Sequence, residues 1–481
     1  MPFQFLRTNR QAWGALVLLF LVSLPAVTTR IYASDEAEYF SYLRSLWFDG
    51  DVSFENEYRY FDEHGLARAS GFHETFLERQ TATGLRENWG TIGCAILWSP
   101  FYGAADLGVR ALRLAGRPVE ADGFSHPYVA AVCYGSAFYG FMALILSAMA
   151  AARILGASGA GGAAGGTDAA AVLAAWLGTP LLFYMYVSPP FSHACSAFAV
   201  AAFVVAWLRV RETWSTGGLV LLGVLGALMT MVREQDVFFV AGPALDFLWT
   251  LARRSPRSGP GRAGRSAASL LASAAAGVAA AAVAYLPQAL AYLALNGRVG
   301  PSQVVARKMY WTAPHALEVM FSPEHGLFFW TPLALVALAG IAVIAAKGGD
   351  RRRVASALAV MFAAQVYVSG SVDSWSAAGA FGHRRFVGTT VILVVGLAAL
   401  ARTPARRLFR AGLTAAVVLG IWWNLALTVQ FGTGLMDRQR LDLGLNARTA
   451  FIEVPARLPG LAWRYLFDRA SFYAVPDGGD R

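Results

Sequence analysis

The sequence predicts an all-α polytopic membrane protein, a bundle of about 11 transmembrane helices. Of its 481 residues, 56% are hydrophobic and 15% are charged, whereas a soluble chain carries about a quarter charged residues. Apolar runs near the roughly 20 residues that cross a bilayer recur from end to end. The net charge of +10 comes from short basic loops between these runs. That is the positive-inside pattern of a membrane protein, and we expect no nucleic-acid partner.

We predict eleven spans, within a range of 10–13. They cover residues 13–29, 128–152, 169–187, 191–208, 217–232, 237–251, 268–293, 326–346, 354–370, 387–401 and 411–430. The first follows Arg7 and Arg10 and resembles a signal peptide. Because so many spans follow it, we expect an uncleaved first helix.

Basic loops set the expected orientation. The segments 253–265, 347–353 and 402–410 are rich in arginine and should face the cytoplasm. Counting back from them makes the apolar run 91–109 a juxtamembrane or re-entrant helix and not a crossing. The same counting gives one extracytoplasmic face to the loop 31–127, the turns 188–193 and 232–236, the loops 294–325 and 371–386, and the tail.

The expected organisation is one transmembrane module over residues 1–430. Its long first extracytoplasmic loop, 31–127, contains juxtamembrane helices, and its cytoplasmic linkers lie at 153–168 and 253–266. A short extracytoplasmic tail covers 431–481.

Acidic residues follow the first span. Asp35 and Glu36 are adjacent, with Glu38 close behind. A carboxylate at a bilayer edge loses hydration, which suggests a cation, a partner or a proton to handle. The alternative is a helix start, because acids in the first turn favour the helix dipole. Both interpretations stay open, since an acid at a helix start can also be a base.

The segment "VREQD" interrupts an apolar stretch with Arg233, Glu234 and Asp236. These charges either pair with one another at a hairpin tip, or Arg233 faces a lipid phosphate, which a guanidinium grips through two hydrogen bonds. Glu234 is then a candidate substrate-binding residue.

The loop "DSWSAAGAFGHRRF" places His383, Arg384 and Arg385 before an inward-running span. This is opposite to the side where basic residues normally anchor. The cluster therefore predicts an anion, either acidic side chains or a phosphate. Trp375 in the same loop is a candidate substrate-binding residue.

Two further histidines, His193 and His325, lie at the starts of predicted helices on the same face. Each is either a structural residue or a substrate ligand. No His/Cys cluster suggests zinc, while the acids of the first loop have enough oxygens for a divalent cation without a spacing that requires one. The three cysteines lie in apolar stretches with no paired spacing, which argues against disulfides.

Taken together, these motifs resemble the GT-C superfamily of membrane glycosyltransferases. The resemblance is carried by the acids after span one and by the strings "TPLLFYMYVSPPFSHACSAF", "VREQD", "SPEHGLFFWTP" and "SWSAAGAFGHRRF". Closest in character are the bacterial relatives of protein O-mannosyltransferases and of the aminoarabinose transferase. The resemblance covers roughly residues 13–430.

The resemblance implies an inverting glycosyltransferase of the bacterial inner membrane that works on its extracytoplasmic face. A polyprenyl-phosphate-linked sugar would be the donor, and a hydroxyl of a glycan, lipid or protein the acceptor. Asp35 would be the general base and Glu36 its partner. Arg233 and the His383-Arg384-Arg385 cluster would hold the donor phosphate.

Two other functions remain open. A transporter or flippase for a lipid-linked or anionic substrate requires ionisable residues near mid-bilayer and an internal repeat, and we find no repeat between the halves. A ligase or acyltransferase would use the same lipid carrier and an essential histidine, for which His193 or His383 would serve.

Overall fold

The chain folds as an all-helical bundle. The computed structural model describes residues 10–64, 71–156, 163–253, 266–377 and 379–472. Residues 157–162 and 254–265, within the two predicted cytoplasmic linkers, lie outside the described residues, as do residues 473–481 at the end of the tail. Within the described ranges the chain forms no β-strand beyond two isolated bridges, Gln80 with Arg86 and Met309 with Val372.

Six described helices are long and apolar enough to cross a membrane. They are α6 (His126–Leu155), α9 (His193–Val210), α12 (Ala267–Ala284), α18 (Gly349–Gly370), α19 (Thr390–Ala401) with the preceding η6 (Arg384–Thr389), and α20 (Arg407–Gly432). Shorter apolar helices are α2 (Arg10–Ser23) with η1 (Leu24–Ala26), α7 (Ala163–Leu177), α10 (Thr216–Val232) and α17 (Pro332–Ala346). Every predicted span overlaps one or two helices, and the all-helical architecture confirms the predicted fold class, an all-α polytopic membrane protein.

Several predicted spans are broken into two helices. The shorter helices that follow or precede these breaks are α8 (Leu181–Tyr186), η5 (Glu234–Val240) with α11 (Ala241–Ala252), α13 (Leu286–Asn296) and α16 (Leu327–Trp330). Proline accompanies three of these breaks, at Pro180, Pro287 and Pro332. Proline lacks the N–H that continues a helical ladder, so it favours a break at these positions.

The first loop and the tail add short helices. The loop contains α3 (Ser34–Arg44), η2 (Ser45–Asp49), α4 (Glu55–Glu63), η4 (His73–Glu78) and α5 (Gly93–Leu114). Later segments add α14 (Gln303–Arg307), α15 (Ala316–Phe321), α21 (Leu443–Arg448), η7 (Thr449–Glu453), α22 (Val454–Phe467) and η8 (Arg469–Phe472). The run 91–109 thus lies in α5, which is not among the six long apolar helices.

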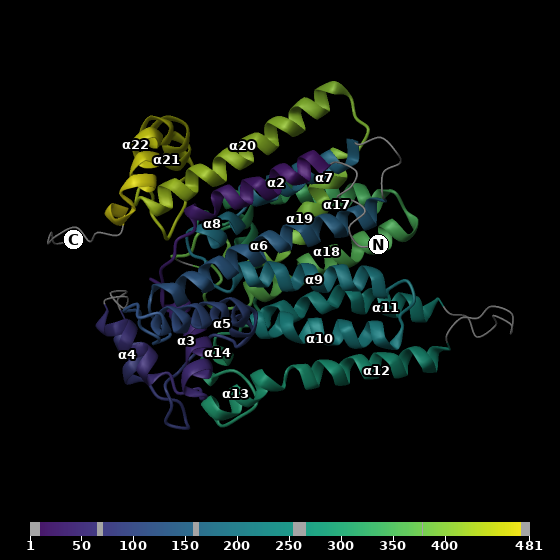
Figure 1. The fold of residues 1–481 in the computed structure, drawn as a ribbon. Coiled ribbons are helices and arrows are strands. Elements are labelled where there is room, and N and C mark those ends of the chain that lie inside the picture. Colours follow the sequence, from purple (N-terminus) through teal and green to yellow (C-terminus); the bar gives the residue numbers. More distant parts are fainter. Residues whose placement is uncertain (1–9, 65–70, 157–162, 254–265, 378, 473–481) are drawn as a thin grey trace.

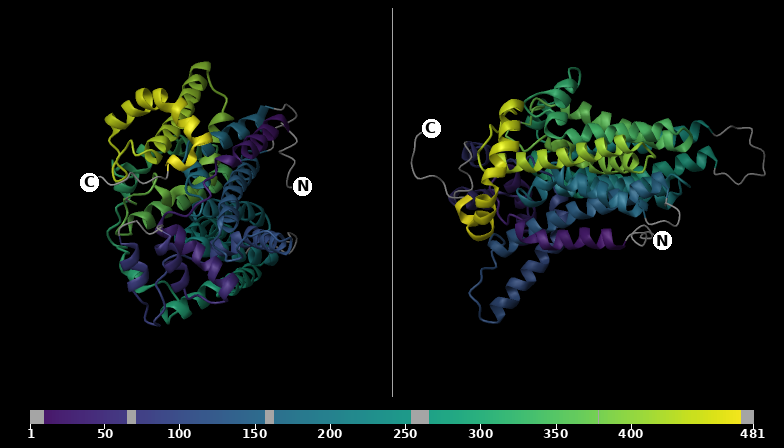
Figure 2. Two further views of the ribbon diagram at one scale, coloured as in Figure 1. Left: turned by 60° about the vertical axis from the view of Figure 1, so that its left-hand side comes forward. Right: turned by 90° about the horizontal axis from the view of Figure 1, so that it is seen from above.

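The long helices run side by side, and the short ones gather at one end of the bundle. Figure 1 shows α3, α4, α13, α14, α21 and α22 at this end, which we call the site end, and Figure 2 shows the tail helices there from two further directions. The Arg469 Nη1 donates to the carbonyl of Pro25 at 2.9 Å, which ties the tail to the end of α2.

Glycine pairs let the long helices approach closely. A Cβ on Gly340 of α17 would clash with the backbone of Gly396 in α19, and one on Gly223 of α10 would clash with Gly277 in α12. Close backbone contact through small residues is the usual way in which membrane helices pack, because lipid gives no hydrophobic driving force between them. These contacts hold the bundle that carries the site.

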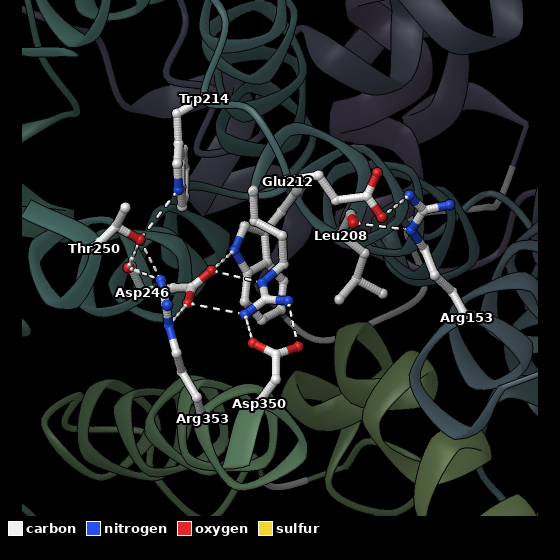
Figure 3. A network of polar contacts seen from close by, with 10 residues as sticks. Arg153, Leu208, Glu212, Trp214, Asp246, Thr250, Asp350 and Arg353 are labelled. Atoms are coloured by element: carbon white, nitrogen blue, oxygen red, sulfur yellow. Dashed lines mark hydrogen bonds and ion pairs between the residues drawn. The ribbon is translucent and has the colours of Figure 1, made fainter. Parts of the chain in front are cut away.

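Ion pairs join the helices at the opposite end. Asp246 of α11 accepts from Arg211 Nε at 2.8 Å and also pairs with Arg353 of α18, while Arg211 Nη2 contacts Asp350 at 2.7 Å (Figure 3). Arg402 pairs in the same way with Asp168. Arg353 and Arg402 belong to two of the arginine-rich segments, and we call this end of the bundle the basic end.

Candidate functional site

An ion pair joins the first loop to the turn before α19. Asp35 lies in the first turn of α3, and Arg384 opens η6. The Arg384 Nη1 donates to the Asp35 Oδ2 at 2.7 Å. The Asp35 side chain is 41% exposed and the Arg384 side chain 24%. The Asp35 carboxylate is therefore partly open to solvent, although neither residue is among those that line the cavity described below.

Glu36 holds the start of α3. Its Oε2 accepts from the backbone N–H of Tyr32 at 2.8 Å and of Ala33 at 3.2 Å. Burial raises its pKa to about 8, although these two hydrogen bonds oppose the shift. The other carboxyl oxygen is buried without a described partner. Glu36 thus caps the start of α3, as the helix-start interpretation of these acids expects. Because Asp35 is the preceding residue, Glu36 also helps to position it.

Glu38 is a second buried carboxyl beside Asp35. Its Oε1 accepts from the backbone N–H of Trp89 at 2.7 Å. Burial first, and then the negative charge of Asp35, raise the pKa of Glu38 to about 8. The cations Arg384 and Lys308 oppose this shift. Glu38 is therefore bonded to the backbone of Trp89 and lies near the charges of Asp35 and Arg384.

Arg233 lies at the break between α10 and η5, where its backbone is extended. Its Nη1 approaches the Ser192 Oγ at 3.0 Å and the His193 Nδ1 at 3.1 Å, and its Nη2 reaches Gln235 Oε1 at 3.3 Å. The Nε is buried without a described partner. Within the described residues the hydrogen-bond partners of this guanidinium are neutral groups, so its charge remains available for an anion.

The acids that follow Arg233 point to other partners. The hydroxyl of Tyr292 in α13 donates to Glu234, and burial raises the pKa of Glu234. The Ser196 hydroxyl donates to Asp236 at 2.6 Å, and burial raises the pKa of Asp236 to about 7. Glu234 thus bonds to Tyr292 and not to Arg233, whereas the positive charge of Arg233 lies near enough to Asp236 to oppose the rise of its pKa.

Arg385 faces the same region from the other side. Its guanidinium contacts Ser374, through the carbonyl at 2.8 Å and the hydroxyl at 3.1 Å. Its own carbonyl accepts from the amides of Gln235 at 3.1 Å and Gln365 at 3.0 Å. These two amides fix the turn before α19 against η5 and α18. Arg233 and Arg385 are thereby held at defined positions.

A cavity of about 490 Å³ lies between these elements. Arg233, Glu234, Gln235 and Arg385 form its polar wall. Aromatic side chains form much of the rest, namely those of Tyr39, Trp89, Phe238 and Trp311. Such a mixture of flat apolar faces and cations suits a ligand that combines a ring with an anionic group.

One wall of the cavity comes from the segment after α13. Its residues 305, 306, 309 and 311 line the cavity. The segment is joined to the loop after α18, because Asp373 N–H donates to the Lys308 carbonyl at 2.8 Å and His315 N–H to the Gly370 carbonyl at 2.9 Å. The cavity wall therefore combines the first loop, η5, the segment after α13 and η6.

The predicted histidines are buried beside the site. His383 has no described partner for either ring nitrogen, and burial, with the charge of Arg385, holds its pKa well below the usual range. Its neutral ring adds no positive charge for a phosphate. His325 stacks on Trp330, its Nε2 meets the Ala380 carbonyl at 2.9 Å, and burial lowers its pKa to about 4.

Among the candidate substrate residues Glu234 lines the cavity, whereas Glu38, His193, His325 and Trp375 do not. Trp375 stacks on His315 with ring centroids 5.2 Å apart. His193 contacts Arg233, and its ring packs against that of Tyr184 with ring centroids 4.3 Å apart. These contacts help to position the Arg233 guanidinium. Within the described ranges no group of three or more His, Cys, Asp or Glu is arranged to hold a metal ion.

Sequence reasoning missed Gln235 and Lys308. Gln235 lies between Glu234 and Asp236, but its amide carries no charge that would mark it as a candidate residue. Lys308 lies 4.8 Å from the ring centroid of Trp89. Its signal was present in the composition, because Lys308 and Lys347 are the only two lysines among 40 basic residues.

No protein-family model matches the chain, and no curated protein matches it. Among solved structures it is similar to the archaeal oligosaccharyltransferase AglB from Archaeoglobus fulgidus, determined in complex with an inhibitory peptide and a dolichol-phosphate. The two chains share 12% identity with a TM-score of 0.46. The match covers 98% of this chain and 60% of AglB. The helices themselves place this chain among the all-α, multi-pass membrane proteins.

Proposed function

We propose that the protein is an inverting glycosyltransferase of the GT-C type. It moves a sugar from a polyprenyl-phosphate donor to an acceptor hydroxyl on the extracytoplasmic face of the bacterial inner membrane. The site end is the extracytoplasmic end in this proposal, because the basic end carries the arginine-rich segments. The acceptor is a glycan, a lipid or a protein.

One observation carries the proposal. A partly exposed carboxylate, Asp35, meets Arg384 at 2.7 Å, and Arg384 adjoins an arginine that lines a cavity with Arg233. An acid and several arginines from distant parts of the chain thus meet at one end of the bundle. A base and an anion site side by side are what sugar transfer from a phosphate requires.

The chemistry assigns one task to each side of the site. The Asp35 carboxylate takes the proton of the acceptor hydroxyl as its oxygen attacks the anomeric carbon. The bond from that carbon to the donor phosphate breaks, and the electron pair leaves with the phosphate. Attack and departure occur on opposite faces of the sugar, which inverts the anomeric centre. Glu36 keeps the start of α3, and hence Asp35, in position.

Most of the rate enhancement should come from the arginines. The phosphate gains a negative charge as it leaves, and Arg233 and Arg385 stabilise this charge with guanidinium groups that are already in place. General-base help from Asp35 adds roughly 10²–10⁴-fold. The aromatic walls hold the sugar ring, and the apolar helices beside the cavity accommodate the lipid chain.

The test uses purified full-length protein in lipid nanodiscs. The substrates are polyprenyl phosphates that carry radiolabelled hexoses or pentoses, together with an envelope fraction from a deletion strain as acceptor. The proposal predicts transfer of label, release of polyprenyl phosphate and an inverted anomer in the product. It also predicts that Arg233→Met with Arg385→Met abolishes transfer, while Arg410→Met at the basic end does not. In liposomes, movement of intact labelled lipid across the bilayer without cleavage would instead establish a flippase.

A further inference from the structure

The tail helix α22 exposes large apolar side chains at the site end of the bundle. Trp463 is 65% exposed, Leu466 72% and Phe467 68%. The rings of Trp463 and Phe467 lie against each other with their centroids 4.3 Å apart. In the preceding η7, Phe451 and Ile452 are exposed as well. Large apolar side chains that are exposed side by side mark a surface that meets a partner or a membrane.

The residues of α22 separate into three faces at the helical repeat of 3.6 residues per turn. Val454 is buried against α20, and Leu461 and Tyr465 line a cavity between α22, α2 and α20, so these residues form the inner face. The exposed apolar face lies next to it. An apolar face beside a charged one is the pattern of a helix that lies in a membrane interface. The charged face consists of Arg457, Arg464 and Asp468.

The packing of the tail on α20 fixes its depth. Between Ala411 and Phe431, α20 has no charged residue, and this stretch is about 31 Å long at about 1.5 Å per residue. That length matches the roughly 30 Å of hydrocarbon in a bilayer. Ala450 and Val454 pack against Ala426, which lies about 7 Å before the end of the stretch. Interfacial helices lie at this depth, about 5–10 Å below the headgroups.

The direction of α22 fits the same location. Figure 2 shows the tail helices running across the direction of α20 at the site end. Because the long helices cross the membrane, a helix that runs across them lies along the membrane surface. At the depth given by Ala426, its exposed side chains are level with the acyl chains of that leaflet.

The neighbours of α22 are two helices that face lipid. The Tyr465 hydroxyl donates to the Ala26 carbonyl at the end of α2, and Val454 packs against α20. Both neighbours expose large apolar side chains of their own, as membrane helices do where they meet lipid. These are Leu18, Leu21 and Val22 on α2, and Val418 and Leu419 on α20.

We propose that η7 and α22 form an interfacial membrane helix whose partner is the lipid leaflet at the site end. Trp463, Leu466 and Phe467 insert among the acyl chains, and the charged face, with Arg457, stays at the level of the headgroups. The tail is then part of the membrane-bound surface of the protein. This inference goes beyond the proposed sugar transfer and does not depend on it.

The test measures the depth of single side chains in the full-length protein. Nitroxide labels are attached to Trp463→Cys and Phe467→Cys on the apolar face, and to Arg457→Cys as a matched control on the charged face of the same helix. The three native cysteines are buried, and labelled wild type gives their background signal. The proteins are placed in nanodiscs of phosphatidylcholine and phosphatidylglycerol. Electron paramagnetic resonance then compares collisions with oxygen, which concentrates in lipid, and with a water-soluble nickel chelate.

We expect the ratio of oxygen to chelate collisions at positions 463 and 467 to exceed that at position 457 by about fivefold. Equal ratios on the two faces, or a label at 463 and 467 that collides mainly with the chelate, would overturn the inference and place the tail in water. Labels at 463 and 467 that both reagents fail to reach would also overturn it, because another protein or a second copy of this chain would then cover the face. None of these outcomes bears on the transfer of sugar.

Discussion

Replacing Asp35 by asparagine removes the charge of the proposed base while it keeps the size of the side chain. The carboxylate pairs with Arg384 at 2.7 Å, with side chains 41% and 24% exposed. Exposed ion pairs of this kind contribute about 0–1 kcal/mol to stability. The Asp35→Asn variant should therefore fold and accumulate in the membrane nearly as the wild type does.

Activity should respond far more strongly than stability. Loss of general-base catalysis lowers kcat by about 10²–10⁴-fold, which corresponds to about 2.7–5.4 kcal/mol at about 1.36 kcal/mol for each factor of ten. The effect should appear in kcat, because the donor phosphate is bound by Arg233 and Arg385 and not by Asp35. A change confined to KM would instead mean that Asp35 only positions Arg384.

The assay is transfer of radiolabelled sugar from a polyprenyl-phosphate donor in nanodiscs, at saturating donor and several acceptor concentrations. Glu63→Gln is the matched control, since Glu63 is an exposed carboxylate of α4 in the same loop. It should keep wild-type kcat. Full kcat in Asp35→Asn would refute the assignment of the base.

Three further predictions concern other charges. Arg233→Lys should weaken binding of polyprenyl phosphate about tenfold, because an ammonium cannot grip a phosphate with two parallel hydrogen bonds; unchanged affinity in a lipid titration would contradict this. Glu38 has its pKa raised to about 8, so its contribution to stability is present below about pH 4.5 and is lost as the pH rises towards 8. Glu38→Gln should therefore flatten the fall in melting temperature over this range, and an identical pH profile would rule the idea out. Asp246→Asn should lower the free energy of unfolding by about 3–5 kcal/mol, because the cations of Arg211 and Arg353 lose a buried partner, while activity per folded molecule stays constant; denaturation and transfer assays on one preparation check both.

The helices could be predicted from the sequence because their signal is local. Each span is a run of apolar residues of membrane length, and its ends are marked by charges. Alternation of loops across a bilayer then brought Asp35, Arg233 and Arg384 to one face without any knowledge of packing. That shared face is consistent with the pairing of Asp35 and Arg384 but does not predict it.

The partners inside the site could not be predicted, because they depend on which side chains meet after packing. Adjacent acids such as Asp35 and Glu36 look alike in sequence, yet one is partly exposed beside an arginine and the other is buried on backbone N–H groups. The breaks that shape the site are visible only in part, since Pro180 marks one of them and the break at Arg233 has no proline. Lys308 meets Trp89 through a contact between distant segments.

A structure of the protein with bound polyprenyl phosphate tests the central claim most directly. The account predicts phosphate density between the guanidinium groups of Arg233 and Arg385, with the lipid chain leaving towards the apolar helices and Asp35 facing the space beside the phosphate. Phosphate bound at the basic end, near Arg353 or Arg402, would contradict it.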